Sequence, residues 1–443
     1  MVNDLEVLLR RNVESLPPDR LDLGDVVTAG RRRVRGRRRR AVLLGSAGLA
    51  MAAIGAVAVL HAPLGIGPAG VAGPPAPDAP TLHLADARDA VRGSDYRVLA
   101  SYTNDNLDQA NGQYFDGVTT DGQILFRDDS RLALMDPATG HKDWLPPRPR
   151  AQHQAWVVEL GTHRLVLITE AGSSQSSDGS MDIKIAADVY DRSTGQWSET
   201  SWPGLPPAAT PGVVMGPDQR LYVRVLATQG QPPPGGWPTD ASGEAEDSNA
   251  SGVTYRLWSV SPTDSTDVRD EGLTVGDVAF TRTSMVWTDA TNGAPGQVHV
   301  RDLATGAERS FDPRMGDRCN LLSFGASGDR VVMGEYCGEY DGVRDDRIQV
   351  VSLEGDQVVT VQDSGIDGGL SGPDGNDLVR IDAQGRDLPG AYVYDLASGT
   401  FLRLNDGVSP FSLGGPTPSG QLLWNSAVNH RHGATQWLGQ FGS

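Results

Sequence analysis

Cysteine and lysine are scarce in this chain of 443 residues, and the common catalytic signatures are missing. The only two cysteines, Cys319 and Cys337, supply too few ligands to form a metal site by themselves. No Gly-x-Ser-x-Gly elbow occurs, so the sequence offers no serine-hydrolase nucleophile of that type. We therefore assign no catalytic residue, no cofactor and no metal ligand, and we favour a protein that is not an enzyme.

Histidines and clustered acids add no metal site. Apart from His430 and His432 the histidines are scattered, and solvated loop positions explain them better than ligation. The others are His61, His83, His141, His153, His163 and His299. Four acids crowd the segment after Cys337, but their spacing does not match an EF-hand-type calcium loop. We expect a solvated acidic loop there, made of Glu339, Asp341, Asp345 and Asp346.

Charge is divided unequally along the chain. Residues 1–40 hold 11 arginines and 6 acids, a net charge of +5, although the whole chain carries −18. Residues 41–60 are uncharged, so the remainder carries −23. A domain this acidic repels nucleic acid, and nucleic-acid binding is therefore disfavoured.

The junction between these regions predicts a membrane anchor. Ala41–Leu60 follows directly on an arginine block, and 20 residues at 1.5 Å each make a helix of about 30 Å, the thickness of the bilayer core. Positive flanks stay on the cytoplasmic side and contact anionic lipid, so we expect residues 1–40 inside and the rest outside the plasma membrane. The block consists of Arg31, Arg32, Arg33, Arg35, Arg37, Arg38, Arg39 and Arg40.

Two alternatives to an uncleaved anchor stay open. Leu60-His61-Ala62 resembles a signal-peptide cleavage site, although Pro63 follows it, and Arg39-Arg40 resembles a twin-arginine export signal. Under either alternative the large domain lies outside the cytoplasm. Residues 61–80 are rich in Pro, Gly and Ala, which predicts an extended linker.

Residues 81–443 are built by repetition. In each copy, an apolar strand ends in Asp, and a turn with Thr-Gly or Ser-Gly follows it. The Asp side chain can accept hydrogen bonds from nearby backbone N–H groups, and Gly takes the position in the turn that needs a positive φ. The four clearest turns run Asp136–Gly140, Asp191–Gly195, Asp302–Gly306 and Asp395–Gly399. With two degenerate copies, spacings near 40–65 residues predict a β-propeller.

The repeat also predicts how the ring closes. Each copy is preceded by a second strand, and the last of these, Gln421–Trp424, has no outer partner downstream. We expect Tyr96–Tyr102 to pair with Thr435–Phe441, which gives seven blades, one of them shared between the two ends. The predicted fold class is therefore all-β, a seven-bladed β-propeller behind an N-terminal transmembrane helix.

The two cysteines bracket a predicted hairpin of Cys319–Gly325 and Arg330–Cys337. With a turn about Gly328, residue i faces residue 656 − i, so Cys319 lies opposite Cys337. Cα atoms of such a pair lie about 4.5–5.5 Å apart, within reach of a disulfide. An oxidising compartment favours the bond, and the entropy of loop closure gives it about 3 kcal/mol.

The repeats make the chain resemble the extracytoplasmic β-propellers of bacteria, the WD-repeat and quinoprotein-like group. The resemblance implies the architecture alone. The sequence lacks the Gly-His and Trp-Asp signatures of WD repeats, so we carry over no scaffolding role. It also lacks a regular tryptophan-docking motif, so we carry over no quinone cofactor. The layout also resembles membrane-anchored regulators of alternative sigma factors in actinobacteria, which implies a cytoplasmic partner. Residues 1–40 hold none of the His or Cys of the zinc motif common in anti-sigma domains.

These features predict a single-pass membrane protein that recognises an extracytoplasmic ligand or protein. Leu5, Leu8, Leu9, Val13 and Leu16 lie at helical spacing and indicate a weak amphipathic helix, on the membrane face or against a cytoplasmic regulatory partner. Alternatives are an envelope glycan-active enzyme with paired carboxylates and a structural envelope protein. Acids with perturbed pKa values facing the channel would favour the enzyme, and an apolar rim would favour binding.

Overall fold

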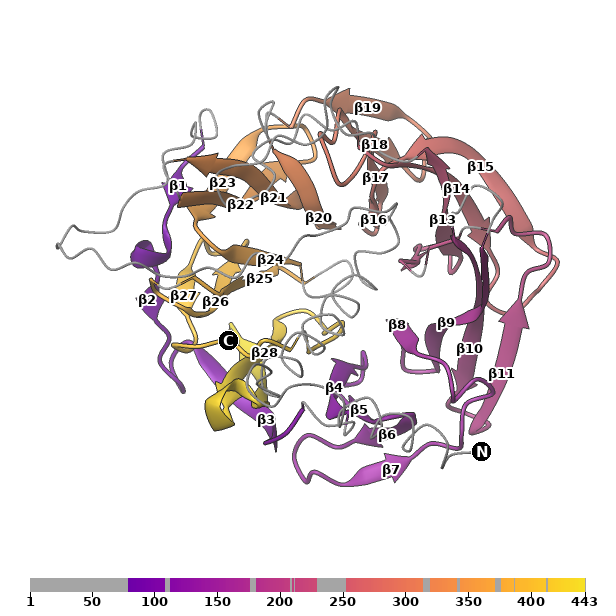
Figure 1. Ribbon diagram of the computed structural model, residues 1–443, viewed down its shortest axis with the longest axis horizontal. Coiled ribbons are helices and arrows are strands. Elements are labelled where there is room, and N and C mark those ends of the chain that lie inside the picture. Colours follow the sequence, from indigo (N-terminus) through magenta and orange to yellow (C-terminus); the bar gives the residue numbers. More distant parts are fainter. Residues whose placement is uncertain are drawn as a thin grey trace, which may run out of the picture. The chain divides into compact units, whose positions relative to one another are not determined.

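Hydrogen bonding arranges the chain into seven β-sheets that follow one another around a ring (Figure 1). The computed structural model describes residues 79–107, 112–175, 181–207, 209–210, 212–228, 252–313, 319–340, 343–370, 376–385, 387–411 and 413–442. All of them belong to the second of two compact units, Leu44–Ser443. The predicted all-β, seven-bladed propeller is confirmed.

Each blade is an antiparallel meander, numbered here in chain order. Blades 1 and 2 are β4 (Gln113–Val118), β5 (Ile124–Asp128), β6 (Arg131–Met135) and β7 (Lys142–Trp144), then β8 (Ala155–Leu160), β9 (Arg164–Gln175), β10 (Met181–Asp191) and β11 (Gln196–Ser201). Blades 3 and 4 are β12 (Val214–Met215), β13 (Leu221–Thr228), β14 (Thr254–Val260) and β15 (Val268–Val275), then β16 (Val278–Phe280), β17 (Ser284–Thr288), β18 (Val298–Asp302) and β19 (Glu308–Phe311). Blades 5 and 6 are β20 (Asn320–Ser327), β21 (Arg330–Tyr340), β22 (Val343–Ser352) and β23 (Gln357–Asp363), then β24 (Ile366–Leu370), β25 (Leu378–Ala383), β26 (Gly390–Asp395) and β27 (Phe401–Arg403). Blade 7 is β28 (Gln421–Val428), β29 (Gly433–Phe441) and β3 (Tyr96–Asn104).

Apolar cores lie between the blades. Among the described residues there are seven clusters of buried apolar side chains, and each joins two neighbouring blades. Between blades 2 and 3, for example, Val166 and Val189 pack with Leu221 and Val223. Because the middle strands of the blades bury side chains on both faces of the sheet, no blade covers its own core, and stability depends on a complete ring.

The ring is closed by strands from the two ends of the chain, as predicted. β3 pairs antiparallel with β29, so that Tyr96 faces Phe441 and Tyr102 faces Gln436, with one bulge between Leu438 and Gly439. The Tyr96 ring stacks on Phe441 and meets Trp424 edge-on. Blade 7 therefore contains residues more than 300 positions apart in the sequence.

A segment before β3 runs along the outer edges of blades 5 and 6, which the sequence did not indicate (Figure 1). β1 (Thr81–Leu82) pairs parallel with β23, and β2 (Arg88–Asp89) pairs parallel with β27. Between them η1 (Leu84–Asp86) buries Leu84. We call Ala79–Asp95 the strap. It covers two edge strands that would otherwise expose unpaired backbone groups.

The repeated Asp-to-Gly turns all connect the third and fourth strands of a blade. In each, the Asp Oδ1 accepts from the backbone N–H groups two and three residues on, at 2.7 and 2.9 Å for Asp136. Gly140, Gly195, Gly306 and Gly399 all have φ near +70°. The Thr139 amide lowers the pKa of Asp136, and the Thr305 hydroxyl lowers that of Asp302. The turns therefore form from local bonds and need no contact with another blade.

The disulfide between Cys319 and Cys337 is present, with Cα atoms 3.9 Å apart. The predicted register is wrong over most of the hairpin, because Gly328 and Asp329 form a two-residue turn and Ser327 faces Arg330. A bulge between Leu321 and Ser323 then shifts the pairing by one residue, so that Asn320 faces Tyr336. The predicted pairing of the cysteines is thus correct because of an irregularity that the sequence did not reveal.

The arginine block, the predicted transmembrane helix and the linker up to residue 78 lie outside the described residues. Among the described residues, no helix is long and apolar enough to cross a membrane.

Candidate functional site

The inner ends of the blades enclose a cavity of about 540 Å³ at the centre of the ring. Residues from all seven blades line it, at or near the end of the first strand in blades 1 to 6 and just before β28 in blade 7. We call this lining the channel mouth. It consists of Val118, Thr120, 157–161, 213–217, Gln219, 278–282, 324–326, Leu370 and 416–418.

The channel mouth is mainly apolar. Valine, leucine, methionine, phenylalanine and proline supply most of its side chains, and Glu159 and Arg282 are the only charged residues among the described residues that line it. Ligand pockets are typically apolar with a few placed polar groups, so this composition suits binding.

Blade 7 contributes to the mouth through an irregular segment in place of an inner strand. The Val118 amide donates to the Pro416 carbonyl at 2.8 Å, which holds that segment against β4. A Cβ on Gly415 would lie 2.2 Å from the Asp116 carbonyl oxygen, and one on Gly117 would lie 2.6 Å from Leu160 Cδ1. Only glycine permits this approach at both positions.

The acid at the mouth is already paired. Glu159 accepts from Arg164 Nε at 2.9 Å, and Arg164 Nη2 donates to Gln219 Oε1 of the next blade at 2.8 Å. The chain Glu159–Arg164–Gln219 therefore ties blades 2 and 3 together at the mouth. It is an inter-blade contact rather than the pair of opposed carboxylates that glycoside hydrolysis needs.

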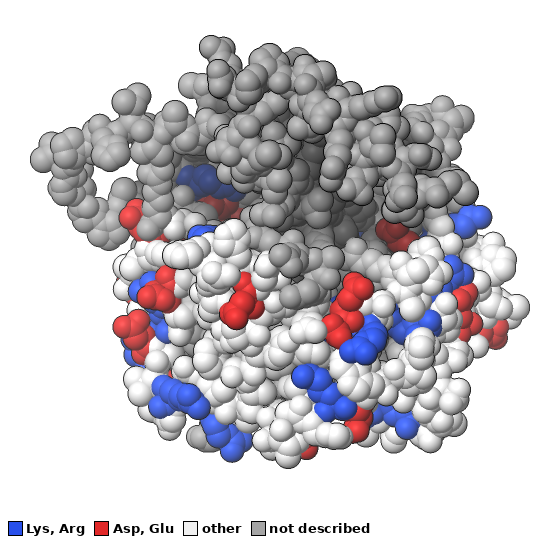
Figure 2. Space-filling view, turned by 60° about the horizontal axis from the view of Figure 1, so that its bottom comes forward, with Lys and Arg blue, Asp and Glu red and all other residues white. Residues whose placement is uncertain are grey.

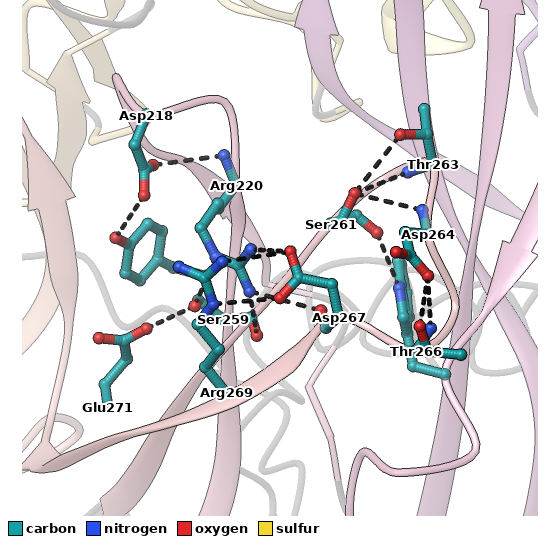
Figure 3. A network of polar contacts seen from close by, with 12 residues as sticks. Asp218, Arg220, Ser259, Ser261, Thr263, Asp264, Thr266, Asp267, Arg269 and Glu271 are labelled. Carbon is teal, nitrogen blue, oxygen red and sulfur yellow. Dashed lines mark hydrogen bonds and ion pairs between the residues drawn. The ribbon is translucent and has the colours of Figure 1, made fainter.

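Behind the mouth, a polar network crosses blade 3 from the inner turn to the outer strand (Figure 3). Asp218 accepts from the Tyr222 hydroxyl at 3.1 Å, and burial together with that carboxylate raises the pKa of Tyr222. Arg220 donates to Ser259 Oγ at 2.9 Å and pairs with Asp267. Because Ser259 is fully buried and donates to Glu271, it is not an accessible nucleophile. The network holds the inner turn in place.

A second buried network joins blades 1 and 2. Arg127 donates from Nε to Asp116 at 2.8 Å and from Nη2 to the Ala155 carbonyl of the next blade at 3.2 Å. Burial raises the pKa of Asp116 in spite of Arg127. Arg148 and the fully buried Asp188 form a further pair at 2.7 Å. Burial raises the pKa of Asp188 as well. Both acids are therefore engaged by an arginine, and these contacts fix blade 1 to blade 2.

The described surface is not uniformly acidic. On the face shown in Figure 2, acidic and basic side chains are interspersed, often next to one another. The described chain contains ion pairs between such side chains, for example Arg256 with Asp270 and Arg88 with Asp95. The Arg88 guanidinium and the Val91 amide lower the pKa of Asp95 to about 2.

Two of the acids expected in a solvated loop lie elsewhere. Asp345 and Asp346 belong to β22 and are buried, so the expectation of a solvated loop is wrong for both. Arg347 donates to both oxygens of Asp345, at 2.9 and 2.6 Å, and Arg344 donates to Asp346. Residues two apart share a strand face, so Arg344-Asp345-Asp346-Arg347 makes two pairs within one strand. Opposite charges two residues apart in the sequence were therefore the signal that these acids are paired within a strand.

The described histidines do not come together in a metal-binding group. His141 contacts Asp143, His83 Nδ1 lies 2.8 Å from the Gln362 carbonyl oxygen, and His299 stacks on Trp287 beside Asp289. One group of three possible ligands does occur among the described residues, and it consists of Cys319, Glu335 and Cys337.

No protein-family model matches the sequence, and no curated protein matches it as a relative. Among solved structures, the chain is similar to the β-propeller domain of Cps50 (Swd1) from Myceliophteria thermophila, with 10% identity, coverage of 77% of this chain and 99% of that one, and a TM-score of 0.40. It is also similar to TolB from Acinetobacter baumannii, with 10% identity, coverage of 75% and 79%, and a TM-score of 0.33. A prolyl endopeptidase matches with 17% identity, 73% and 45% coverage and a TM-score of 0.43. These likenesses are too distant to bear on function, and the propeller rests on the strand pairing of this chain alone.

Proposed function

We propose that this protein is a membrane-anchored recognition module whose propeller lies outside the cytoplasm and binds an apolar group of its ligand at the channel mouth. The observation that carries the proposal is the lining of the mouth, which is apolar and comes from all seven blades. Burial of apolar surface stabilises such a complex by about 25 cal/mol per Å² before the cost of association.

The same lining speaks against catalysis at this position. The one acid, Glu159, is bound by Arg164, and the described mouth offers no second carboxylate to act with it. General acid and base catalysis of glycoside cleavage uses two carboxylates about 5–9 Å apart. Recognition without chemistry is the function that these side chains support best.

The tether is supported by the sequence and by two features of the propeller. The arginine block followed by Ala41–Leu60 favours an anchor with the N-terminus inside. Disulfides such as Cys319–Cys337 persist in oxidising compartments. The described chain begins in the strap, at the outer edge of blade 5 and not at the channel mouth (Figure 1). Coupling to a cytoplasmic partner through residues 1–40 stays a prediction of the sequence.

Replacement of Val213 by Glu is expected to weaken binding of the neutral hydrophobic probe N-phenylnaphthylamine to the full-length protein. Val213 is half-buried and lines the mouth. A charge there removes apolar contact area worth about 1.5–3 kcal/mol, which corresponds to a loss of affinity of about 10- to 100-fold. Fluorescence titration measures it.

The matched control is Val91→Glu, because Val91 is exposed and does not line the mouth. It should bind the probe as the wild-type protein does. Equal affinity in all three proteins would place the probe outside the mouth and contradict the binding proposal.

Protease added to intact cells is expected to remove an epitope tag fused after Ser443 and to spare a tag fused before Met1. The physical reason is the predicted orientation, in which the bilayer shields only the residues on the cytoplasmic side. Immunoblotting before and after permeabilisation measures both tags. Protection of both tags in intact cells would contradict the extracytoplasmic location.

A further inference from the structure

Cys319, Glu335 and Cys337 form one buried cluster in blade 5, away from the channel mouth. One possible ligand atom from each residue, Sγ or a carboxylate oxygen, lies within 4.8 Å of the others, and all three side chains are at most 3% exposed. Both cysteines belong to the apolar core that joins blade 5 to blade 4. The cluster therefore lies between two blades and not on the surface.

Strand geometry accounts for this convergence. Glu335 and Cys337 are two residues apart in β21, so they share one face of the sheet. The bulge in β20 brings the cysteines opposite each other, and Leu321 faces Glu335. In β22, Arg347 faces Glu335. The same face therefore presents the two sulfurs, the Glu335 carboxyl group and the Arg347 guanidinium, which is paired with Asp345.

Glu335 is an unusual residue for this position. Its Oε1 has no hydrogen-bond partner among the described residues, although the side chain is only 2% exposed. Its Oε2 lies 3.8 Å from Cys337 Sγ, which carries no proton while the disulfide is intact. Burial raises the pKa of Glu335 well above its usual range. An unsatisfied buried carboxyl group destabilises the fold, and apolar packing would avoid that cost.

We propose that reduction of the Cys319–Cys337 disulfide creates a binding site for a Zn²⁺-class cation, with the two sulfurs and a Glu335 carboxylate oxygen as ligands. Thiolate ligands select zinc over magnesium or calcium, which prefer oxygen. Two thiolates and one carboxylate are ligand types of known zinc sites, with a water in the fourth position. The oxidised protein has no such site, because both sulfurs are bonded to each other.

The chemistry balances with a phosphine as reductant. The S–S bond accepts two electrons and two protons to give two thiols, and the phosphine takes an oxygen atom from water to become its oxide. Zn²⁺ then displaces the two thiol protons, so binding releases protons and weakens as pH falls.

A neutral ion pair lies beside the ligands. Two thiolates and a carboxylate around Zn²⁺ leave one net negative charge, and Arg347 faces Glu335 across the strands. Arg347 is held by Asp345, which also accepts from Gln362 Nε2 at 3.0 Å. This pair fixes a guanidinium beside the Glu335 carboxyl group, in the position of an outer-shell partner of the ligands, without changing the net charge of the site.

The test is a titration of the full-length, metal-free protein with Zn²⁺ alone, before and after reduction by a water-soluble phosphine. We expect about one bound zinc per reduced chain and much less per oxidised chain, measured by elemental analysis after gel filtration. With Co²⁺ in place of zinc, the reduced protein should show thiolate-to-cobalt charge-transfer absorption.

Variants separate this site from adventitious binding. Glu335→Gln imitates the protonated acid and should fold. Its affinity for zinc should fall by more than the roughly 10- to 100-fold that loss of an outer-shell partner costs, because Glu335 is itself a ligand. Cys319→Ser should abolish the cobalt absorption. Glu199→Gln, the same change on the outer strand of blade 2, should behave as wild type. Three results would each overturn the proposal: wild-type affinity in reduced Glu335→Gln, equal binding by oxidised and reduced protein, or a disulfide that resists reduction in the folded chain.

Discussion

A chain that begins at Gly112, and so lacks β3, is expected not to fold to a soluble monomer. Without β3, blade 7 keeps β28 and β29 alone, and β29 loses its pairing with β3 from Ala434 to Phe441. The cores on both sides of blade 7 open as well, because Tyr96 packs in one of them and Leu99 and Tyr102 pack in the other. An open ring exposes an apolar face at each break, and such faces aggregate.

A second truncation isolates the effect of β3. A chain that begins at Ser94 loses β1 and β2 but keeps β3, and it should remain a soluble monomer of reduced stability, since each lost strand has only two residues. Gel filtration and thermal unfolding followed by circular dichroism measure both chains. If the Gly112 chain unfolds as cooperatively as the Ser94 chain, closure by β3 is not what holds the ring together.

A point variant tests the same closure within the intact chain. Leu438 is fully buried in the core between blades 7 and 1, and Leu438→Ala should cost about 2–5 kcal/mol of unfolding free energy. Leu303→Ala, at a side chain that is 41% exposed, should change it by no more than about 0.5 kcal/mol.

The ring and its closure were predictable because their signals are local and repeated. The Asp-to-Gly turns depend on side-chain and backbone bonds within five residues, so four copies are legible without knowledge of the fold. The second and third strands of each blade are apolar and long. A count of these strands leaves Gln421–Trp424 without an outer partner downstream. The missing strand of that blade must therefore come from the N-terminal end of the propeller.

The channel mouth was not predictable in the same way. Its residues lie on the first strands, and two of these, β12 and β16, have only two and three residues. A strand that short shows no alternation of apolar and polar residues. In blade 7 the inner position is taken by an irregular segment around Pro416, which carries no strand signal at all. That these segments meet at one cavity follows from closure of the ring.

The disulfide and the acids of β22 show two different limits of sequence reasoning. The cysteine pairing was predicted from one uniform register for the whole hairpin. That register is wrong near the turn, and a bulge between Leu321 and Ser323, which has no clear sequence signal, restores it at the cysteines. Asp345 and Asp346 were expected in solvent, because charge density alone was considered and the flanking Arg344 and Arg347 were not. Charge alternation with a period of two inside a strand indicates paired side chains on each face.

Replacement of Arg347 by Met is expected to lower the unfolding free energy by about 3–5 kcal/mol, the cost of breaking one side of a buried ion pair. Arg347 and Asp345 are both buried, and the pair is joined by two hydrogen bonds of 2.9 and 2.6 Å. Without the guanidinium, Asp345 and the neighbouring Glu335 remain in the core with no opposing charge from this residue. Urea unfolding followed by tryptophan fluorescence measures the loss.

The double variant Asp345→Asn, Arg347→Met decides whether the loss comes from an unpaired charge or from lost packing. Removal of both charges leaves no buried ion from this pair, so the double variant should be more stable than Arg347→Met alone. Arg256→Met is the control, because Arg256 is 42% exposed and its pair with Asp270 should contribute only about 0–1 kcal/mol. A double variant as unstable as the single one would mean that the packing of the Arg347 side chain between blades 4 and 5, and not its charge, stabilises this part of the ring.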